Sequence, residues 1–256
     1  VIVTFVFVVA LWIAMSYWTL TDTRRSQRIL WDATRGIRRV TVDRFTSQQA
    51  AKKPWTEKDI SKFHWVNTRT PSREESPEYQ ELAANDFADF RLEVGGMVSA
   101  PASFSLAELK AISSQSQITM HTCMQGWTGI AKWTGIRVRD LLAQVGQIDP
   151  EAGWVMFESF GMAQHMHDGR PVEPYYTCLP LDMALEDDTI LAWGRNDAPL
   201  SGMFGAPLRL RCETSHGYKM IKWVRSVTLI RHYSEGGDGM GGTREDSGYQ
   251  DVNARI

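Results

Sequence analysis

The segment from His121 to Trp127 contains residue types that could hold a redox-active metal. It follows the run Ile118 to Cys123, whose composition predicts a strand, and the chain is expected to turn near Gly126 and expose its side chains. A cysteine thiolate is a soft donor for such a metal, and a neighbouring histidine and a glycine turn could favour the thiolate and admit a cofactor. Taken alone, the segment is equally compatible with a buried Cys123 packed beside an interior His121.

A second candidate site is basic and lies later in the chain. Residues 207–211 and 216–223 carry Arg209, Lys219 and Lys222 around the glycine at position 217. A guanidinium offers a planar fork that suits a phosphate, and lysines and backbone N–H groups of a glycine-containing turn can add donors. These segments therefore predict a site for a compact anion, although an ordinary basic strand face has the same composition.

A third group is His165-Met166-His167, with Tyr175 and Tyr176 downstream. Together with His121 and Cys123, the two histidines could form a zinc or copper site, because imidazole and thiolate are common ligands of these metals. The His-x-His spacing is also common in exposed loops. This metal site therefore remains an alternative to the first interpretation.

The surrounding sequence predicts the elements that would position these residues. Short alternating segments indicate strands, and a few amphipathic segments indicate short helices. Strands are expected at 91–94, 118–123, 154–157, 190–193, 208–212 and 222–231. Ser105 and Glu108 form a capping box that would begin one helix, a second helix is expected over 138–145, and residues 194–197 predict a hairpin turn. Strands outnumber helices, so the predicted fold class is α+β with mixed or antiparallel sheets and short helices.

The two ends of the chain differ from this central part. Residues 1–20 contain no charged residue, and about 20 helical residues cover roughly the 30 Å of a bilayer's hydrocarbon core. This segment predicts an N-terminal transmembrane helix; the alternative of a cleaved signal peptide lacks a basic start and a small-residue cleavage site. Residues 21–60 are then expected to be a polar linker or stalk, 61–235 a soluble domain, and 236–256 a glycine-rich C-terminal tail packed on it.

Basic residues follow the apolar segment immediately. Such clusters tend to stay on the cytoplasmic side of a membrane, so the soluble domain is expected to be membrane-anchored and to face the cytoplasm. Helices upstream of this sequence could reverse the orientation, and an extracytoplasmic position remains open. The residues concerned are Arg24, Arg25, Arg28, Arg35, Arg38 and Arg39.

The composition narrows the class of protein. Of 256 residues, 43% are hydrophobic and ten are tryptophan, which is enough for a sizeable core. The formal charge of −2 gives no general basic field, so duplex nucleic acid is not an expected partner. The three cysteines, Cys123, Cys178 and Cys212, are too few for a disulfide framework and show no CxxC spacing, so at least one thiol is free.

Taken together, the segments resemble the molybdopterin-binding oxidoreductases of the sulfite oxidase superfamily, over roughly residues 60–235. The resemblance rests on a series of blocks that occur in the same order. These blocks are residues 90–96, 121–127 with 133–136 and 139–142, 196–200, 205–209, and 217–223. The family's fold, a molybdopterin-binding α+β fold, is therefore expected here.

The resemblance also implies a molybdenum-molybdopterin cofactor and the residues that bind it. One protein cysteine completes the attachment of the metal in this family, and Cys123 stands at the matching position. Arg209 and the loop from Gly217 to Lys222, through Met220 and Ile221, match the part that holds the pterin phosphate. Further polar contacts are implied for Asn67 and Ser159. Tyr175 aligns with a tyrosine of the substrate pocket, and Tyr175 and His121 join Cys123 as the candidate catalytic residues.

Two departures from the family pattern affect the expected substrate and cofactor contacts. Sulfite oxidases have arginines for the sulfite anion shortly after the metal cysteine, whereas this chain has Met124, Gln125 and Gly126. The block therefore resembles the bacterial branch that includes the methionine-sulfoxide-reducing catalytic subunits. The histidine or asparagine expected five residues before Arg209 is Phe204, which removes one polar contact to the cofactor.

We therefore predict a membrane-tethered oxidoreductase that transfers an oxygen atom in a two-electron reaction. Its substrate would be a small oxo- or sulfur-type molecule, and a haem- or quinone-linked membrane partner would exchange electrons with it. Two other interpretations remain. One is a zinc- or other metal-dependent enzyme that uses His121, Cys123, His165 and His167; the other is a non-catalytic binding module on the same fold, suggested by Phe204.

Overall fold

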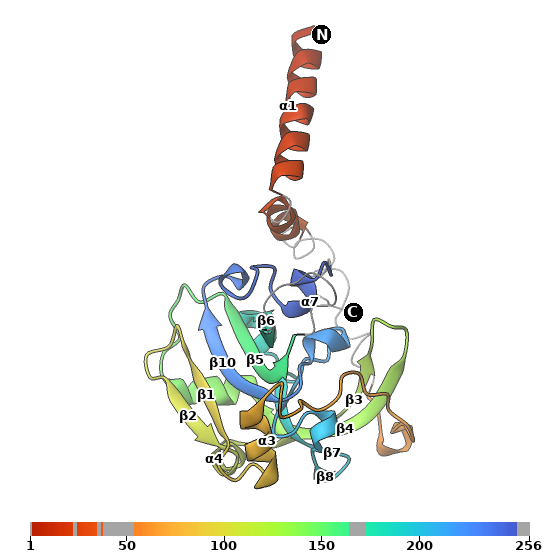
Figure 1. Cartoon of the computed structure of the whole chain (residues 1–256), viewed down its shortest axis with the longest axis vertical. Helices are drawn as coiled ribbons and strands as arrows, with labels where there is room; N and C mark the ends of the chain where they lie inside the picture. The colour runs from red at the N-terminus through yellow and green to blue at the C-terminus, as the bar shows by residue number, and fades with distance from the viewer. Residues whose placement is uncertain (1, 23–24, 35–36, 38–53, 164–172, 250–256) are drawn as a thin grey trace. The chain divides into compact units, whose positions relative to one another are not determined.

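The computed structural model describes residues 2–22, 25–34, 37, 54–163 and 173–249 (Figure 1). The chain separates into two compact units, residues 1–48 and 49–256. In the first unit, α1 (Ile2–Thr21) is followed by a helical stretch over 25–34. Among the described residues, no helix combines the length and the apolar character that a membrane crossing requires. The predicted transmembrane helix over 1–20 is therefore corrected to a helix, α1, without an assigned membrane span.

The second unit contains two sheets whose strands come from distant parts of the chain (Figure 1). The first sheet has the order β2-β1-β10-β5-β6, in which β1 and β10 are parallel and the other pairs are antiparallel. Its strands are β1 (Arg91–Gly96), β2 (Ala102–Ser105), β5 (Trp154–Met162), β6 (Pro174–Pro180) and β10 (Val224–Ile230). This sheet is mixed, as the predicted fold class requires.

The second sheet is antiparallel throughout. It has the order β3-β4-β7-β8, and β9 pairs with β7. Its strands are β3 (Gln115–Thr122), β4 (Thr128–Arg137), β7 (Ile190–Arg195), β8 (Ala198–Pro199) and β9 (Arg209–Arg211). Asn196 and Asp197 connect β7 to β8 with φ values of 51° and 61°, which is the left-handed geometry of a tight hairpin turn. The turn predicted over 194–197 is confirmed.

The described helices of this unit are short. The α-helices are α3 (Pro77–Ala84), α4 (Leu106–Ile112), α5 (Val138–Leu142), α6 (Leu181–Ala184) and α7 (Thr243–Asp246). Single 3₁₀ turns are η2 (Glu57–Asp59), η3 (Ala143–Val145), η4 (Gly202–Phe204), η5 (Gly217–Lys219) and η6 (Tyr233–Glu235). The capping box that was predicted to begin α4 is present, since Ser105 N donates to Glu108 Oε2 at 2.7 Å and Glu108 N donates to Ser105 Oγ at 3.2 Å. The α+β class is confirmed.

Both sheets contribute to one hydrophobic core. Leu92, Val155 and Val227 of the first sheet belong to the same buried cluster as Ile136 and Leu210 of the second. Burying several such side chains completely stabilises the fold by about 1.5–3 kcal/mol for each. The shared core fixes the two sheets to each other, and so fixes the positions of the side chains that the ends of their strands carry.

The sequence did not predict β4, because Gly129 and Gly135 within it are typical of turns. In the structure, these glycines allow close approach instead. A Cβ atom on Gly135 would lie 2.1 Å from the carbonyl oxygen of Leu191, on the neighbouring strand β7. Glycine at position 135 is therefore needed for the pairing of β4 with β7.

We expect Gly135→Ala to lower the free energy of unfolding by about 1–3 kcal/mol, the usual effect of overpacking, because β7 must move to accommodate the methyl group. Gly95→Ala is the matched control, since a Cβ there would meet Pro101 Cβ at 3.7 Å, an ordinary contact. Denaturant unfolding of both variants measures the difference. Equal stability of the two would contradict this account of β4.

Candidate functional site

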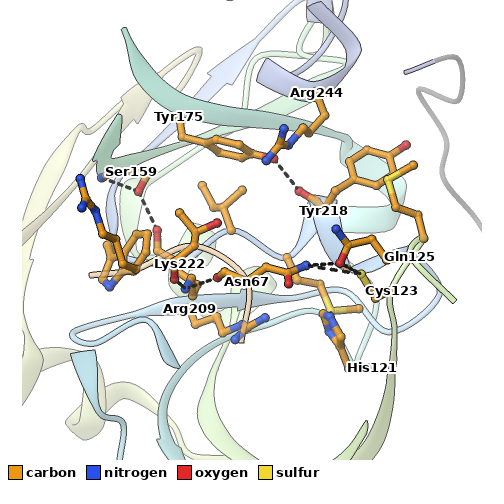
Figure 2. Close-up of a pocket in the computed structure, with 18 of the residues that line it drawn as sticks. Asn67, His121, Cys123, Gln125, Ser159, Tyr175, Arg209, Tyr218, Lys222 and Arg244 are labelled. Carbon is orange, nitrogen blue, oxygen red and sulfur yellow. Dashed lines mark hydrogen bonds between the residues drawn. The ribbon is translucent and has the colours of Figure 1, made fainter. Parts of the chain in front are cut away.

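One cavity of the second unit is lined by segments that lie far apart in the sequence (Figure 2). It contains about 970 Å³ of empty space, part of which is open to solvent. All the cofactor-binding and catalytic residues that the family resemblance implied line this cavity: Asn67, His121, Cys123, Ser159, Tyr175, Arg209, Gly217, Met220, Ile221 and Lys222. Lys219, the other lysine considered for the anion site, is instead buried in an ion pair with Glu245. The fold thus brings the predicted residues together, while their individual roles remain predictions.

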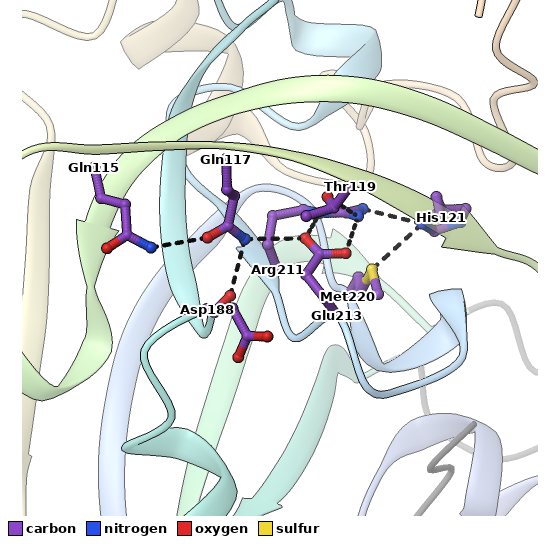
Figure 3. A network of polar contacts seen from close by, with 8 residues as sticks. All are labelled: Gln115, Gln117, Thr119, His121, Asp188, Arg211, Glu213 and Met220. Carbon is purple, nitrogen blue, oxygen red and sulfur yellow. Dashed lines mark hydrogen bonds and ion pairs between the residues drawn. The ribbon is translucent and has the colours of Figure 1, made fainter. Parts of the chain in front are cut away.

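Strand β3 directs Cys123 toward the cavity. Alternate residues of a strand share one face, and Gln115, Gln117, Thr119 and His121 do so here (Figure 3). The strand ends at Thr122, and Cys123 continues the alternation into a turn closed by a bond from Gly126 N to Cys123 O at 3.0 Å. The cysteine is 7% exposed and is not in a disulfide. Its sulfur lies 3.6 Å from Asn67 Nδ2, which donates to it.

The other residues on this face of β3 form a buried polar network (Figure 3). The Arg211 guanidinium donates to both carboxylate oxygens of Glu213, at 2.8 and 2.6 Å, and Gln117 Nε2 donates to the same carboxylate at 3.2 Å. Arg211 Nη1 also lies 3.0 Å from His121 Nδ1. Arginine has no acceptor, so the histidine accepts at Nδ1 and carries its hydrogen on Nε2.

His121 is held as a neutral ring. Burial, then the charges of Arg211 and Arg209, place the pKa of His121 far below its ordinary value. Its Nε2 edge faces Gly217, where a Cβ atom would lie only 2.2 Å away, so no larger residue fits at position 217 without displacing the ring. The ring also stacks on Trp127 with centroids 5.3 Å apart. The ring is thus neutral and fixed in place, and the catalytic role of His121 stays a prediction.

Arg209, on β9, is a buried cation without an ion-pair partner among the residues that the structure describes. Its side chain is mostly buried, Nη1 donates to Phe204 O at 3.2 Å, and Nε has no hydrogen-bond partner. Burial, then the neighbouring Arg211, lowers the pKa of Arg209 to about 9, so it stays charged at neutral pH. A buried charge that lacks a counter-ion is destabilising unless an anion binds. Arg209 therefore fits the phosphate of the predicted cofactor.

Phe204 contacts two arginines of the site, and its predicted effect on cofactor binding stays a prediction. Its backbone carbonyl supplies the contact to Arg209, and its ring lies 4.0 Å from the guanidinium carbon of Arg195. Trp133 adds a second aromatic face, 5.1 Å from Arg209 and 4.4 Å from Arg211. Aromatic faces attract cations, so these rings stabilise a cluster of guanidinium groups that would otherwise repel one another. The aromatic ring of Phe204 thus helps to stabilise the positively charged arginines next to the cavity.

Lys222 joins two segments at the cavity through hydrogen bonds to their backbone. Its ammonium donates to the carbonyl oxygens of Asn67, Thr68 and Met203 at 2.8, 2.8 and 3.1 Å, which uses all three of its donors. Burial, then Arg209, lowers the pKa of Lys222 to about 7, while the three acceptors favour the charged form. Ser159 is similarly engaged, because its hydroxyl donates to Lys222 O at 2.7 Å. Contact of these two side chains with the cofactor remains a prediction.

The sequence did not indicate that the C-terminal tail lines the cavity. Arg244, from α7, and Tyr249 both do so, together with Tyr218. Tyr175 donates to Tyr218 O at 3.2 Å, and burial raises its pKa well above the ordinary value, so its hydroxyl stays protonated. Figure 2 shows Tyr175 and Arg244 on one wall of the cavity and Asn67 and Cys123 on the other. The spacing of residues in a glycine-rich tail does not predict that its side chains line a cavity.

The alternative zinc site has no ligand set in the part of the chain that the structure describes. His165 and His167 lie outside the described residues. Within the described ranges, no three histidine, cysteine, aspartate or glutamate side chains are grouped so that they could hold a metal ion. The interpretation of the protein as a zinc enzyme therefore rests on residue types alone.

Comparison with known proteins identifies the family. A family model described as the oxidoreductase molybdopterin binding domain matches residues 79–237. The chain belongs to this family. Its cofactor is accordingly a molybdenum-molybdopterin, and the predicted membership in the sulfite oxidase superfamily is confirmed.

Several relatives match the same part of the chain. A putative protein-methionine-sulfoxide reductase subunit, YedZ1, of Azospira oryzae is 33% identical over 169 residues, which are 66% of this chain and 57% of the relative. The catalytic subunit MsrP of Xanthomonas axonopodis pv. citri, also a protein-methionine-sulfoxide reductase by name, is 32% identical over 56% of this chain and 46% of its own. The chain thus spans about half the length of these curated relatives.

A solved structure is also similar. The sulfane dehydrogenase SoxCD from Paracoccus pantotrophus is 23% identical and has a TM-score of 0.47. The match covers 56% of this chain and 39% of that chain.

We expect Arg209→Met to lower the molybdenum and pterin content of the purified protein at least about tenfold, since charged hydrogen bonds contribute about 1.5–3 kcal/mol each. Arg195→Met is the control, because Arg195 belongs to the same guanidinium cluster but does not line the cavity. Elemental analysis and fluorescence of the extracted pterin measure the contents. A wild-type cofactor content in Arg209→Met protein would contradict the role of this guanidinium.

Proposed function

We propose that this domain catalyses a two-electron oxygen-atom transfer on a small oxo- or sulfur-type substrate, with a sulfoxide as the first candidate. The family membership and the names of the relatives from Azospira and Xanthomonas support this proposal. The observation that carries it is the position of Cys123, whose sulfur lies on the wall of a cavity that also contains the uncompensated Arg209 guanidinium.

In this proposal, Cys123 binds the metal and Arg209 binds the pterin phosphate. When bound, the cofactor supplies the two-electron redox chemistry, and the protein supplies orientation and electrostatics. Asn67 Nδ2 stabilises negative charge on the Cys123 sulfur, and it is oriented by a bond to Gln125 Oε1 at 3.0 Å. Gln125 in turn accepts from Trp127 Nε1 at 3.2 Å. Partners that orient a metal ligand in this way tune its basicity.

The residues around Cys123 determine what else reaches it. His121 is neutral, so it adds no positive charge beside the Cys123 sulfur. The Met220 sulfur packs against the His121 ring, 3.3 Å from Nδ1. Met124 follows the cysteine and is 46% exposed, so it places an apolar side chain where sulfite oxidases have an arginine. An apolar neighbour of this kind suits a substrate that carries a thioether or another organic group on sulfur. Free sulfite fits it less well.

We further propose that a haem- or quinone-linked membrane partner exchanges electrons with the domain. Two relatives are named as subunits, which supports the existence of a second protein. A position of the domain on the cytoplasmic side of a membrane stays a prediction. Protease accessibility in oriented vesicles tests it, and digestion from the outer face alone would overturn it.

We expect Cys123→Ser to lose the molybdenum redox signal and at least about a hundredfold of the rate of dimethyl sulfoxide reduction by a reduced viologen dye, because even residues beyond the ligand shell cost 10–100-fold. Cys178→Ala is the matched control, since Cys178 is fully buried and does not line the cavity. Electron paramagnetic resonance and the dye assay provide the readouts. Zinc without molybdenum in wild-type protein, or an unchanged signal in Cys123→Ser, would contradict the proposal.

A further inference from the structure

The C-terminal tail is fastened to the domain by buried polar contacts on both sides of Arg244. Lys219 and Glu245 form an ion pair in which each side chain is 1% exposed, and Lys219 Nζ also donates to Cys178 O and Gly241 O. Asp246 accepts from Tyr176 OH at 2.5 Å and from the backbone nitrogen of Met240 at 3.0 Å. Breaking a buried ion pair is strongly destabilising, so α7 is held firmly in place.

Arg244 is thereby held against the cavity without a carboxylate partner. Its guanidinium carbon lies 5.8 Å from the centroids of the Tyr175 and Tyr249 rings. No salt bridge to Arg244 is found among the residues that the structure describes, whereas Arg69, which also lines the cavity, is paired with Glu75 at 3.3 Å. A guanidinium has five N–H donors, and contacts with the faces of the two tyrosine rings leave donors for a ligand.

The position of this guanidinium relative to Cys123 suggests what the ligand is. Figure 2 shows Arg244 and Tyr175 facing the cavity from the side opposite Asn67 and Cys123. A group bound in the cavity next to Cys123 therefore has this guanidinium on the opposite wall. Its planar fork and fixed charge suit an oxygen atom with negative charge or a strong dipole. The oxygens of sulfur oxyanions and of sulfoxides both have this character.

We propose that Arg244 binds the sulfur-bound oxygen atom of the substrate inside the cavity and thereby determines which substrates are accepted. The inference rests on the proposed function, because it assigns a substrate-binding residue to the same cavity. It gives the glycine-rich tail a role: the buried Lys219–Glu245 pair positions α7, and α7 presents the arginine. The arginine that this chain lacks after its metal cysteine is in effect supplied from the opposite wall.

The test uses the cofactor-loaded protein, in which the Arg209 site is already taken, and measures binding of inorganic sulfate by calorimetry. We expect Arg244→Gln to weaken sulfate binding at least about tenfold, which corresponds to about 1.4 kcal/mol. Arg244→Lys should give an intermediate loss, since a lysine keeps the charge but not the fork. Arg231→Gln is the control, because Arg231 is exposed and paired with Glu151 far from the cavity lining.

Kinetics with dimethyl sulfoxide separate the two sources of the oxygen. A rise in KM for dimethyl sulfoxide in Arg244→Gln, with kcat little changed, indicates that a neutral sulfoxide uses the site; weaker sulfate binding alone indicates an oxyanion. The inference is overturned if Arg244→Gln binds both probes as the wild type does, or if wild-type protein binds neither. In that case, a molybdenum redox signal in the wild-type protein would still support the proposed function, because that signal does not depend on Arg244.

Discussion

The Lys222 ammonium joins the parts of the chain that form the cavity. Three of its hydrogen bonds reach carbonyl oxygens of two distant segments, Asn67 with Thr68 and Met203, while its own carbonyl accepts from Ser159. These bonds hold the backbone of Asn67, and its side chain is oriented by Gln125 Oε1 at 3.0 Å, so that Nδ2 lies 3.6 Å from the sulfur of Cys123. The surroundings of Cys123, the predicted metal ligand, thus depend in part on this lysine.

The buried charges near the cavity divide into two kinds. Arg211 is neutralised by Glu213, and Lys219 by Glu245, so these pairs are structural and are complete within the protein. Three cations that line the cavity have no carboxylate partner in the described part of the chain: Lys222, which donates to three carbonyl oxygens, and the arginines Arg209 and Arg244. Two guanidinium groups without a carboxylate partner beside one cavity favour the binding of negative groups there. One fits the phosphate of the cofactor, and the other is assigned to the substrate.

Much of the site could be predicted because its chemistry is local in the sequence. The alternation of β3 fixes which face carries His121 and Cys123, and the planar fork of Arg209 made it a candidate for binding an anion. The capping box of α4 and the hairpin after β7 were also predicted, since each depends on residues within a few positions. The short helices and mixed sheets follow from the same local patterns.

The rest depends on tertiary contacts that no spacing reveals. The hydrogen-bond partners of Lys222 lie up to 155 residues away in the sequence. The local sequence therefore predicted that Lys222 binds a phosphate, and not that it holds two distant segments together. Strand β4 was missed because glycines that permit close strand pairing look like turn glycines. Arg244 reaches the cavity through a buried ion pair between Lys219 and Glu245 that is not visible in the sequence of the tail. The transmembrane helix was predicted from an apolar run alone, and the described residues do not confirm it.

X-ray absorption at the molybdenum edge of the cofactor-loaded wild-type protein tests the central claim most directly, because it counts the sulfur atoms bound to the metal. The account predicts one protein thiolate in addition to the two dithiolene sulfurs, and the loss of that one sulfur when position 123 is serine. A metal bound by the dithiolene sulfurs alone in the wild type would contradict the assignment of Cys123 as the ligand.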